Sequence, residues 1–214
     1  MNDLLVLGAS VLPVAVSPQC GTLYFLLGRE TDWATGRPAW CDFGGSTDGD
    51  EGAAACASRE LREESMGLVE ASAESLESIS VARMQFIGQR RLQATEYVTF
   101  LHQIPFTPGL PNRFVQQRLT SACSAAELEK STVQFFSAER LQAAVNGEPG
   151  SIRLRRNFVH RARVALMYLH GEEPNSSGYK HKAPPSTATT TPTPQLSAEP
   201  ICFAAARTLS RFGN

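Results

Sequence analysis

Three glutamates in a short acidic stretch have the spacing of a metal-binding surface. Glu60, Glu63 and Glu64 lie at positions i, i+3 and i+4, so a helix would place them on one face. Neighbouring carboxylates on a bare helix repel one another by roughly a few tenths of a kcal/mol per pair. A hard divalent cation such as Mg²⁺ or Mn²⁺ would offset that repulsion, because these ions prefer oxygen ligands. Such a face supports stabilisation of negative charge and activation of a metal-bound water.

A glycine pair and an acidic turn precede this predicted helix. The pair is Gly44-Gly45, and the turn that follows contains Asp48, Asp50 and Glu51, where negative charge is favoured by the helix dipole. An apolar stripe at helical spacing is suited to packing against a sheet; its members are Ala54, Ala57 and Leu61. The helix is expected to end at Gly67, in a left-handed conformation.

The stretch from Gly45 to Leu68 resembles the box of the Nudix hydrolase family, GX5EX7REUXEEXGU, in which U is aliphatic. Five residues separate Gly45 from Glu51, and seven more precede Arg59-Glu60-Leu61; the pair Glu63-Glu64 is in register. An isolated REXXEE would be interpreted as a solvated acidic helix, but the whole box in register favours the family. One departure is that Ser65 and Met66 both stand before Gly67, where the box has one residue. We expect the additional residue to lengthen the helix end and to leave the metal face unchanged.

The resemblance implies a hydrolase that cleaves a diphosphate linkage in a nucleoside diphosphate derivative, with Mg²⁺ or Mn²⁺ as cofactor. It implies that Glu60, Glu63 and Glu64 hold the metal, with the Gly44 carbonyl as a further ligand. Arg59 would orient the carboxylates, with Glu51 as its ion-pair partner, and either Glu60 or Glu64 would act as general base. Some family members take another glutamate from outside the box. The candidates here are Glu96, Glu127 and Glu129, each of which is otherwise a surface residue.

Composition sets bounds on partners and compartment. The 214 residues carry a net charge of -1, so charge alone indicates neither a nucleic acid nor a membrane partner. Five cysteines lack CxxC spacing, which favours free thiols in a reducing, cytoplasmic compartment over a zinc site or disulfides. No run of about 18 apolar residues occurs, so no transmembrane helix is expected. The N-terminus lacks the basic region of a signal peptide.

Alternating and apolar runs predict six strands and three further helices. The strands are Val11–Val16, Thr22–Gly28, Trp40–Phe43, Ile79–Gly88, Glu96–Ile104 and Thr132–Phe136; the helices are Ala122–Lys130, a helix capped by Ser137 that runs to Val145, and Ile152–His170. Pro13 suggests that the first strand either lies at a sheet edge or begins irregularly. Val69–Ser78 is expected to be a loop with some helical character. Trp40 and Phe43 are assigned to the core rather than to ligand stacking.

The predicted fold class is α/β, a Nudix-like α/β/α sandwich with a mixed sheet covered by the box helix and by the helix from Ile152. Residues 1–170 form the domain; residues 171–200 are Ser-, Thr- and Pro-rich and predict a disordered linker. Residues 201–214 return to apolar residues, compatible with a short helix that docks on the domain or on a partner.

One surface and the function class stay open. Five arginines along the predicted helix Ile152–His170 indicate either a solvated face, which we favour, or a basic surface for a nucleic acid or polyphosphate; they are Arg153, Arg155, Arg156, Arg161 and Arg163. The alternative to a hydrolase of nucleotide-type substrates is a catalytically weak Nudix-fold module that binds nucleotide or RNA. A third hypothesis is a subunit of an RNA-processing complex that docks through residues 201–214.

Overall fold

The computed structural model describes residues 5–32, 34–78, 82–90, 93–120 and 128–171. Within these residues, seven strands form one mixed sheet, with the order β3-β2-β1-β6-β5 and with β4 paired to β1 and β7 paired to β2. The strands are β1 (Leu5–Val16), β2 (Leu23–Asp32), β3 (Arg37–Cys41), β4 (Phe43–Ser46), β5 (Ala82–Arg90), β6 (Gln93–Gln103) and β7 (Thr132–Ser137). The pair β1–β6 is parallel and the other pairs are antiparallel.

Strand β1 lies in the centre of the sheet, so the prediction that Pro13 marks an edge strand was wrong. On one side, β1 pairs with β6 throughout. On its other side, residues 8–11 pair with β4 and residues 14–16 pair with β2. Pro13 therefore falls between two partner strands, where its missing N–H deprives neither β4 nor β2 of a hydrogen bond.

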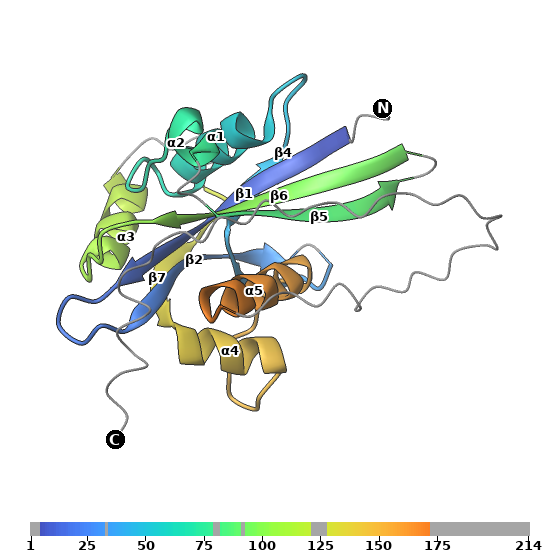
Figure 1. Ribbon diagram of the computed structural model, residues 1–214. Coiled ribbons are helices and arrows are strands. Elements are labelled where there is room, and N and C mark those ends of the chain that lie inside the picture. The colour runs from blue at the N-terminus through green and yellow to red at the C-terminus, as the bar shows by residue number, and fades with distance from the viewer. Residues whose placement is uncertain (1–4, 33, 79–81, 91–92, 121–127, 172–214) are drawn as a thin grey trace.

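Helices cover both faces of the sheet, which confirms the predicted α/β/α sandwich (Figure 1). Helices α1 (Ala53–Glu64), α2 (Ala73–Glu77) and α3 (Leu110–Thr120) lie on one side. Helices α4 (Ala138–Asn146) and α5 (Arg156–Leu169) lie on the other. The predicted covers, the box helix and the helix near residue 152, are α1 and α5.

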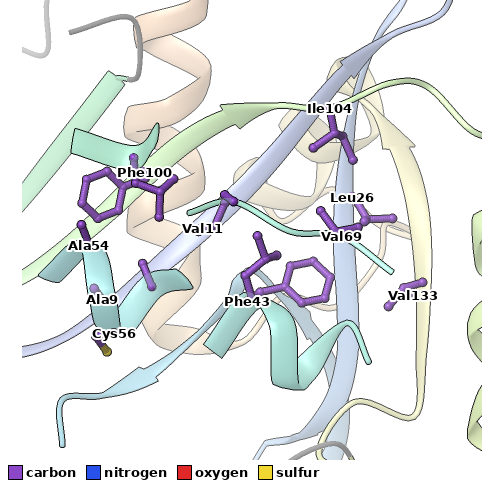
Figure 2. Close-up of a cluster of buried hydrophobic side chains, with 14 of the residues drawn as sticks. Ala9, Val11, Leu26, Phe43, Ala54, Cys56, Val69, Phe100, Ile104 and Val133 are labelled. Atoms are coloured by element: carbon purple, nitrogen blue, oxygen red, sulfur yellow. The ribbon is translucent and has the colours of Figure 1, made fainter. Parts of the chain in front are cut away.

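Each face has its own apolar core. The core under α1 joins Ala54, Ala57 and Leu61 to Val11 and Phe43. Figure 2 shows part of this core, with Ala54 and Cys56 beside Ala9. The core under α5 is formed by Phe158, Ala162, Ala165 and Leu166, which pack on apolar residues of β1 and β2. The apolar stripes of both helices are buried as their spacing predicts, and Phe43 is a core residue.

Two stretches differ from expectation. The structure has a helix, α3, at Leu110–Thr120, where none was predicted from the sequence. Pro111 occupies the first turn of α3, where a helix needs no donor at that position. The connection between the predicted strands Thr22–Gly28 and Trp40–Phe43 is also shorter than their bounds imply, because β2 continues to Asp32 and β3 begins at Arg37.

Several expectations lie outside the described residues. These are the disordered linker from residue 172, the segment 201–214, Glu127 and most of the predicted helix Ala122–Lys130. No helix within the described ranges has the length and apolar character needed to cross a bilayer. The cysteines in the described part of the chain, Cys20, Cys41 and Cys56, are free.

Candidate active site

The side chain of Arg59 gathers three carboxylates of the box. Its Nε and Nη2 donate to the two carboxylate oxygens of Glu51 at 3.2 and 3.0 Å, so the predicted ion pair is present. Its Nη1 donates to Glu60 Oε1 at 2.8 Å and to Glu63 Oε2 at 3.4 Å. We call Arg59, Glu51, Glu60 and Glu63 the Arg59 cluster. Arg59 is 27% and Glu63 30% exposed, whereas Glu51 and Glu60 are 16% and 14% exposed, so the cluster is partly open to solvent.

The glycine of the box lies directly against this cluster. A Cβ atom at Gly45 would collide with the Glu60 carboxylate, so a side chain here would displace Glu60. Burial raises the pKa of Glu60, and the charges of Glu63 and Glu129 add to this effect, while Arg59 opposes it. The pKa of Glu51 is instead lowered by its hydrogen bond with Arg59, so Glu60 accepts a proton more readily than Glu51.

Glu64 belongs to a different, buried group. Its Oε1 lies 3.0 Å from the ammonium of Lys130, and its Oε2 accepts the N–H of Gly44 at 2.7 Å. Lys130 is fully buried, and it also pairs with Glu30 and lies 3.0 Å from Cys41 Sγ. We call Lys130, Glu30, Glu64 and Cys41 the Lys130 cluster.

Charges within the Lys130 cluster depend on one another. Burial acts to lower the pKa of Lys130, but the neighbouring acidic groups outweigh it and the net pKa lies well above that of a free lysine. Burial raises the pKa of Cys41 to about 12, so this thiol is neutral near pH 7. Arg155 contributes a second cation through its ion pair with Glu30. Burial raises the pKa of Glu64 to about 8, although Lys130 and the Gly44 N–H oppose this rise. Two acidic side chains thus face two cations.

The three predicted metal ligands do not converge on one point. Glu60 and Glu63 lie in the Arg59 cluster, whereas Glu64 turns toward Lys130. Within the described residues, one group of three acidic side chains has ligand atoms within 4.8 Å of one another; it is Glu30, Glu64 and Glu129. The helix face was predicted correctly, but the attraction of a buried ammonium draws Glu64 away from the other two.

The end of α1 corrects the interpretation of Met66 as an additional residue. The helix stops at Glu64 and is not lengthened. The N–H of Gly67 bonds to the Arg62 carbonyl at 2.7 Å, and the N–H of Met66 bonds to the Glu63 carbonyl at 3.0 Å. This is a Schellman motif in which Met66, with φ of 58°, takes the left-handed position usually given to glycine. Met66 therefore replaces the box glycine, and burial of its side chain offsets the backbone cost.

A cavity of about 230 Å³ opens on the other side of the glycine pair. Its wall includes Gly44 and Gly45, Tyr97 of β6, and Arg155 and Asn157 at the start of α5. The Nε of Arg155 is buried and has no hydrogen-bond partner among the described residues. A buried donor without a partner is costly, so this atom is suited to receive an acceptor from a ligand.

Four of the five arginines in the predicted basic stripe contact other groups of the chain; they are Arg153, Arg155, Arg161 and Arg163. Arg161 is buried and donates to both oxygens of Asp42, at 2.6 and 3.0 Å, and its guanidinium stacks on Tyr97. Arg153 donates to Thr35, and Arg163 donates to the Val145 carbonyl. Arg161 is therefore neither part of a solvated face nor part of a basic binding surface. Its bonds to Asp42 join α5 to the end of β3.

Some functional positions were missed or misjudged from the sequence. Glu129 was a candidate ligand, and its exposed carboxylate does lie near Glu64. Glu96 is buried, against the expectation of a surface residue. Glu30 and Lys130 were not singled out at all. A signal for Glu30 exists: beyond Gly28, β2 alternates exposed Arg29 and Thr31 with buried Glu30 and Asp32. Lys130 precedes β7 without any pattern of its own.

Comparisons with known proteins complete this picture. The sequence matches no protein-family model and no curated protein. Its structure is similar to that of a Nudix hydrolase from Alicyclobacillus acidocaldarius, with 12% identity, 78% of this chain and 92% of the other covered, and a TM-score of 0.47. A C. elegans Ap4A hydrolase complex aligns at 13% identity over 78% of this chain and 99% of its own, with a TM-score of 0.46.

A third match is shorter relative to its own protein. A MutT/nudix family protein from Enterococcus faecalis aligns over 64% of this chain and 45% of its own length, at 16% identity and a TM-score of 0.43. This chain therefore spans less than half of that protein. At such identities the similarity concerns the fold alone. The chain resembles the Nudix family in the residues of its box and in its layered α/β/α architecture.

Proposed function

We propose that this protein hydrolyses a diphosphate linkage in a nucleoside diphosphate derivative, with Mg²⁺ or Mn²⁺ bound at the Arg59 cluster. The observation that carries the proposal is the convergence of Glu60 and Glu63 on one nitrogen of Arg59, beside the box glycines and partly open to solvent. Carboxylate oxygens are the donors that these ions prefer. A diphosphate is densely anionic, so a cation must stand between it and the glutamates.

The predicted site residues differ in how well their positions suit metal binding and catalysis. Glu60 and Glu63 would hold the cation, whose contribution is to neutralise phosphate charge and to lower the pKa of a bound water. Arg59 holds both side chains in place through its bond to Glu51. Glu60 is the general base that we favour. Glu64 and the Gly44 carbonyl were the other predicted ligands, and Glu64 fits only if Lys130 leaves it.

The cavity beside Gly44 and Gly45 is our candidate for the substrate pocket. It lies next to the box glycines, and the partnerless Nε of Arg155 is a donor for an anionic or carbonyl oxygen. The N-terminus of α5, which has no side-chain cap, adds a favourable field for an anion. The solved Nudix domain of Shewanella oneidensis NrtR, which aligns at 15% identity and a TM-score of 0.40, was obtained with ADP ribose.

A substrate panel tests the proposal. The full chain would be offered ADP-ribose, NAD(H), dinucleoside polyphosphates, capped RNA, inositol pyrophosphates, CoA and oxidised dNTPs, with and without Mg²⁺ or Mn²⁺. We expect metal-dependent turnover of at least one compound, and its loss in Glu60→Gln with Glu63→Gln. Unchanged melting of that variant would show that the fold is kept. No turnover of any compound, or full activity in the double variant, would reject the proposal.

One observation favours a second candidate, a Nudix-fold module that binds nucleotide or RNA with little catalysis. Both oxygens of Glu64 are engaged by groups of the chain itself, which reduces the carboxylates free for metal. Equilibrium binding of the same panel discriminates the two functions. Tight binding of a nucleotide or RNA without any product would support the module.

A further inference from the structure

The packing around Lys130 accommodates its buried side chain. Its stem crosses Gly28 in the middle of β2, where a Cβ atom would lie 2.7 Å from Lys130 Cδ. A strand interior disfavours glycine, so the absence of a side chain here has a reason in packing. The stem of Lys130 occupies the space beside Gly28, and its ammonium reaches Glu30 and Glu64.

The surroundings of the ammonium are those of a bound cation. Nζ contacts Glu30 Oε2, Glu64 Oε1 and Cys41 Sγ, while the carboxylate of Glu129 completes an acidic group within 4.8 Å. Three carboxylates this close have the oxygen ligands that a divalent ion prefers. Here two cations of the chain, Lys130 and Arg155, already face the buried pair Glu30 and Glu64.

We infer that the ammonium of Lys130 is the resident cation of the site formed by Glu30 and Glu64, so that one metal position expected from the box is filled by the chain itself. Glu64 then acts as a positioning residue: its second oxygen accepts the Gly44 N–H at 2.7 Å and fixes the glycine pair beside the cavity. Divalent metal binding is left to the Arg59 cluster. This inference rests on the proposed function for that cluster, but its test does not need turnover.

Counting bound Mn²⁺ tests the inference. The full chain would be titrated with Mn²⁺ alone, and the free ion would be measured by its electron paramagnetic resonance signal. Lys130→Met keeps an unbranched stem of similar length and removes the charge. We expect this variant to bind one more Mn²⁺ per chain than the native protein, through Glu30, Glu64 and Glu129. Adding Glu129→Gln should weaken that additional site at least tenfold.

Glu64→Gln in the native background gives the converse test. If Lys130 is the resident cation, this variant binds as many Mn²⁺ ions as the native protein. One fewer ion in Glu64→Gln, together with no gain in Lys130→Met, would overturn the inference, because Glu64 would then bind metal while Lys130 moved aside.

Two further outcomes are informative. Lys130→Met that folds only when Mn²⁺ is present supports the inference, because the metal then replaces the ammonium; if the variant does not fold with Mn²⁺ either, the count in Glu64→Gln decides. A native protein that binds no Mn²⁺ would reject the proposed function, whereas a gain in Lys130→Met would still support the resident cation.

Discussion

The Arg59 cluster and the Lys130 cluster each join a cation to glutamates of the same helix, but they differ in their access to water. The Arg59 cluster lies at the surface, and its guanidinium shares three carboxylates that keep free lone pairs. In the Lys130 cluster the ammonium is fully buried, and both oxygens of Glu64 are engaged. A solvated carboxylate that shares its cation can replace that ion pair with a bound metal ion. A buried carboxylate whose two oxygens both have hydrogen-bond or ion-pair partners cannot do so without loss of stability.

Substitution of Lys130 should have the largest effect on stability. We expect Lys130→Met to lower the free energy of unfolding by about 3–5 kcal/mol, because Glu64 would remain buried without its cation and Glu30 would keep only Arg155. Urea denaturation at pH 7 without divalent ions measures this change. Arg59→Met is the matched control, with an expected loss of about 1 kcal/mol, because its partners stay hydrated. Equal losses in the two variants would remove the distinction between the clusters.

Catalysis should depend most on the Arg59 cluster. Once a substrate is found, Glu60→Gln should lower kcat/KM on the order of 10²–10⁴-fold, since it removes a ligand and the favoured general base. Steady-state kinetics at saturating Mg²⁺ measures this loss. Glu77→Gln, on the short helix α2, serves as the control and should keep native activity. A decrease of less than threefold in Glu60→Gln would exclude Glu60 from the reaction.

Titration of Glu60 should show without any substrate whether a metal ion binds at the Arg59 cluster. Because burial raises the pKa of Glu60, its carboxyl should titrate above the ordinary value of about 4.3 in metal-free protein. Bound Mg²⁺ favours the charged form, so it should lower this pKa, while Glu139 on the opposite face of the sheet should not respond. Carbon-13 NMR of the side-chain carboxyls measures both. A Glu60 resonance that ignores saturating Mg²⁺ would place the metal elsewhere.

The smallest effect concerns Glu51 and acid stability. The hydrogen bond from Arg59 lowers the pKa of Glu51 in the folded protein. A carboxyl with a depressed pKa contributes stability above its unfolded pKa, and this contribution is lost as the pH falls through the folded value. Glu51→Gln should therefore cost about 1 kcal/mol at pH 7 and progressively less below about pH 4. Denaturation curves from pH 7 to pH 3 measure the difference, and a cost that grows toward low pH would contradict this sign.

The sequence anticipated the helices whose apolar stripes and caps are local. Ser137 caps α4 by accepting the N–H of Arg140, as predicted, and the stripe of α1 packs on the sheet. Predictions failed where partners are distant. Pro13 was assigned to an edge strand, because the sequence does not show that β4 ends and β2 begins opposite this residue. A central strand accepts proline there, since neither partner needs its N–H. Met66 was interpreted as an insertion, because only the hydrogen bonds of the helix end show which residue takes the left-handed position.

For the site, spacing along one helix determined that Glu60, Glu63 and Glu64 are close in space, and the box determined that Arg59 pairs with Glu51. Only the tertiary structure decided which of the three glutamates stays available for a metal. That choice depends on Lys130, 66 positions after Glu64, and on the space left by Gly28. Helical periodicity is a local property of the backbone, whereas the burial of a charge depends on groups that only folding brings together.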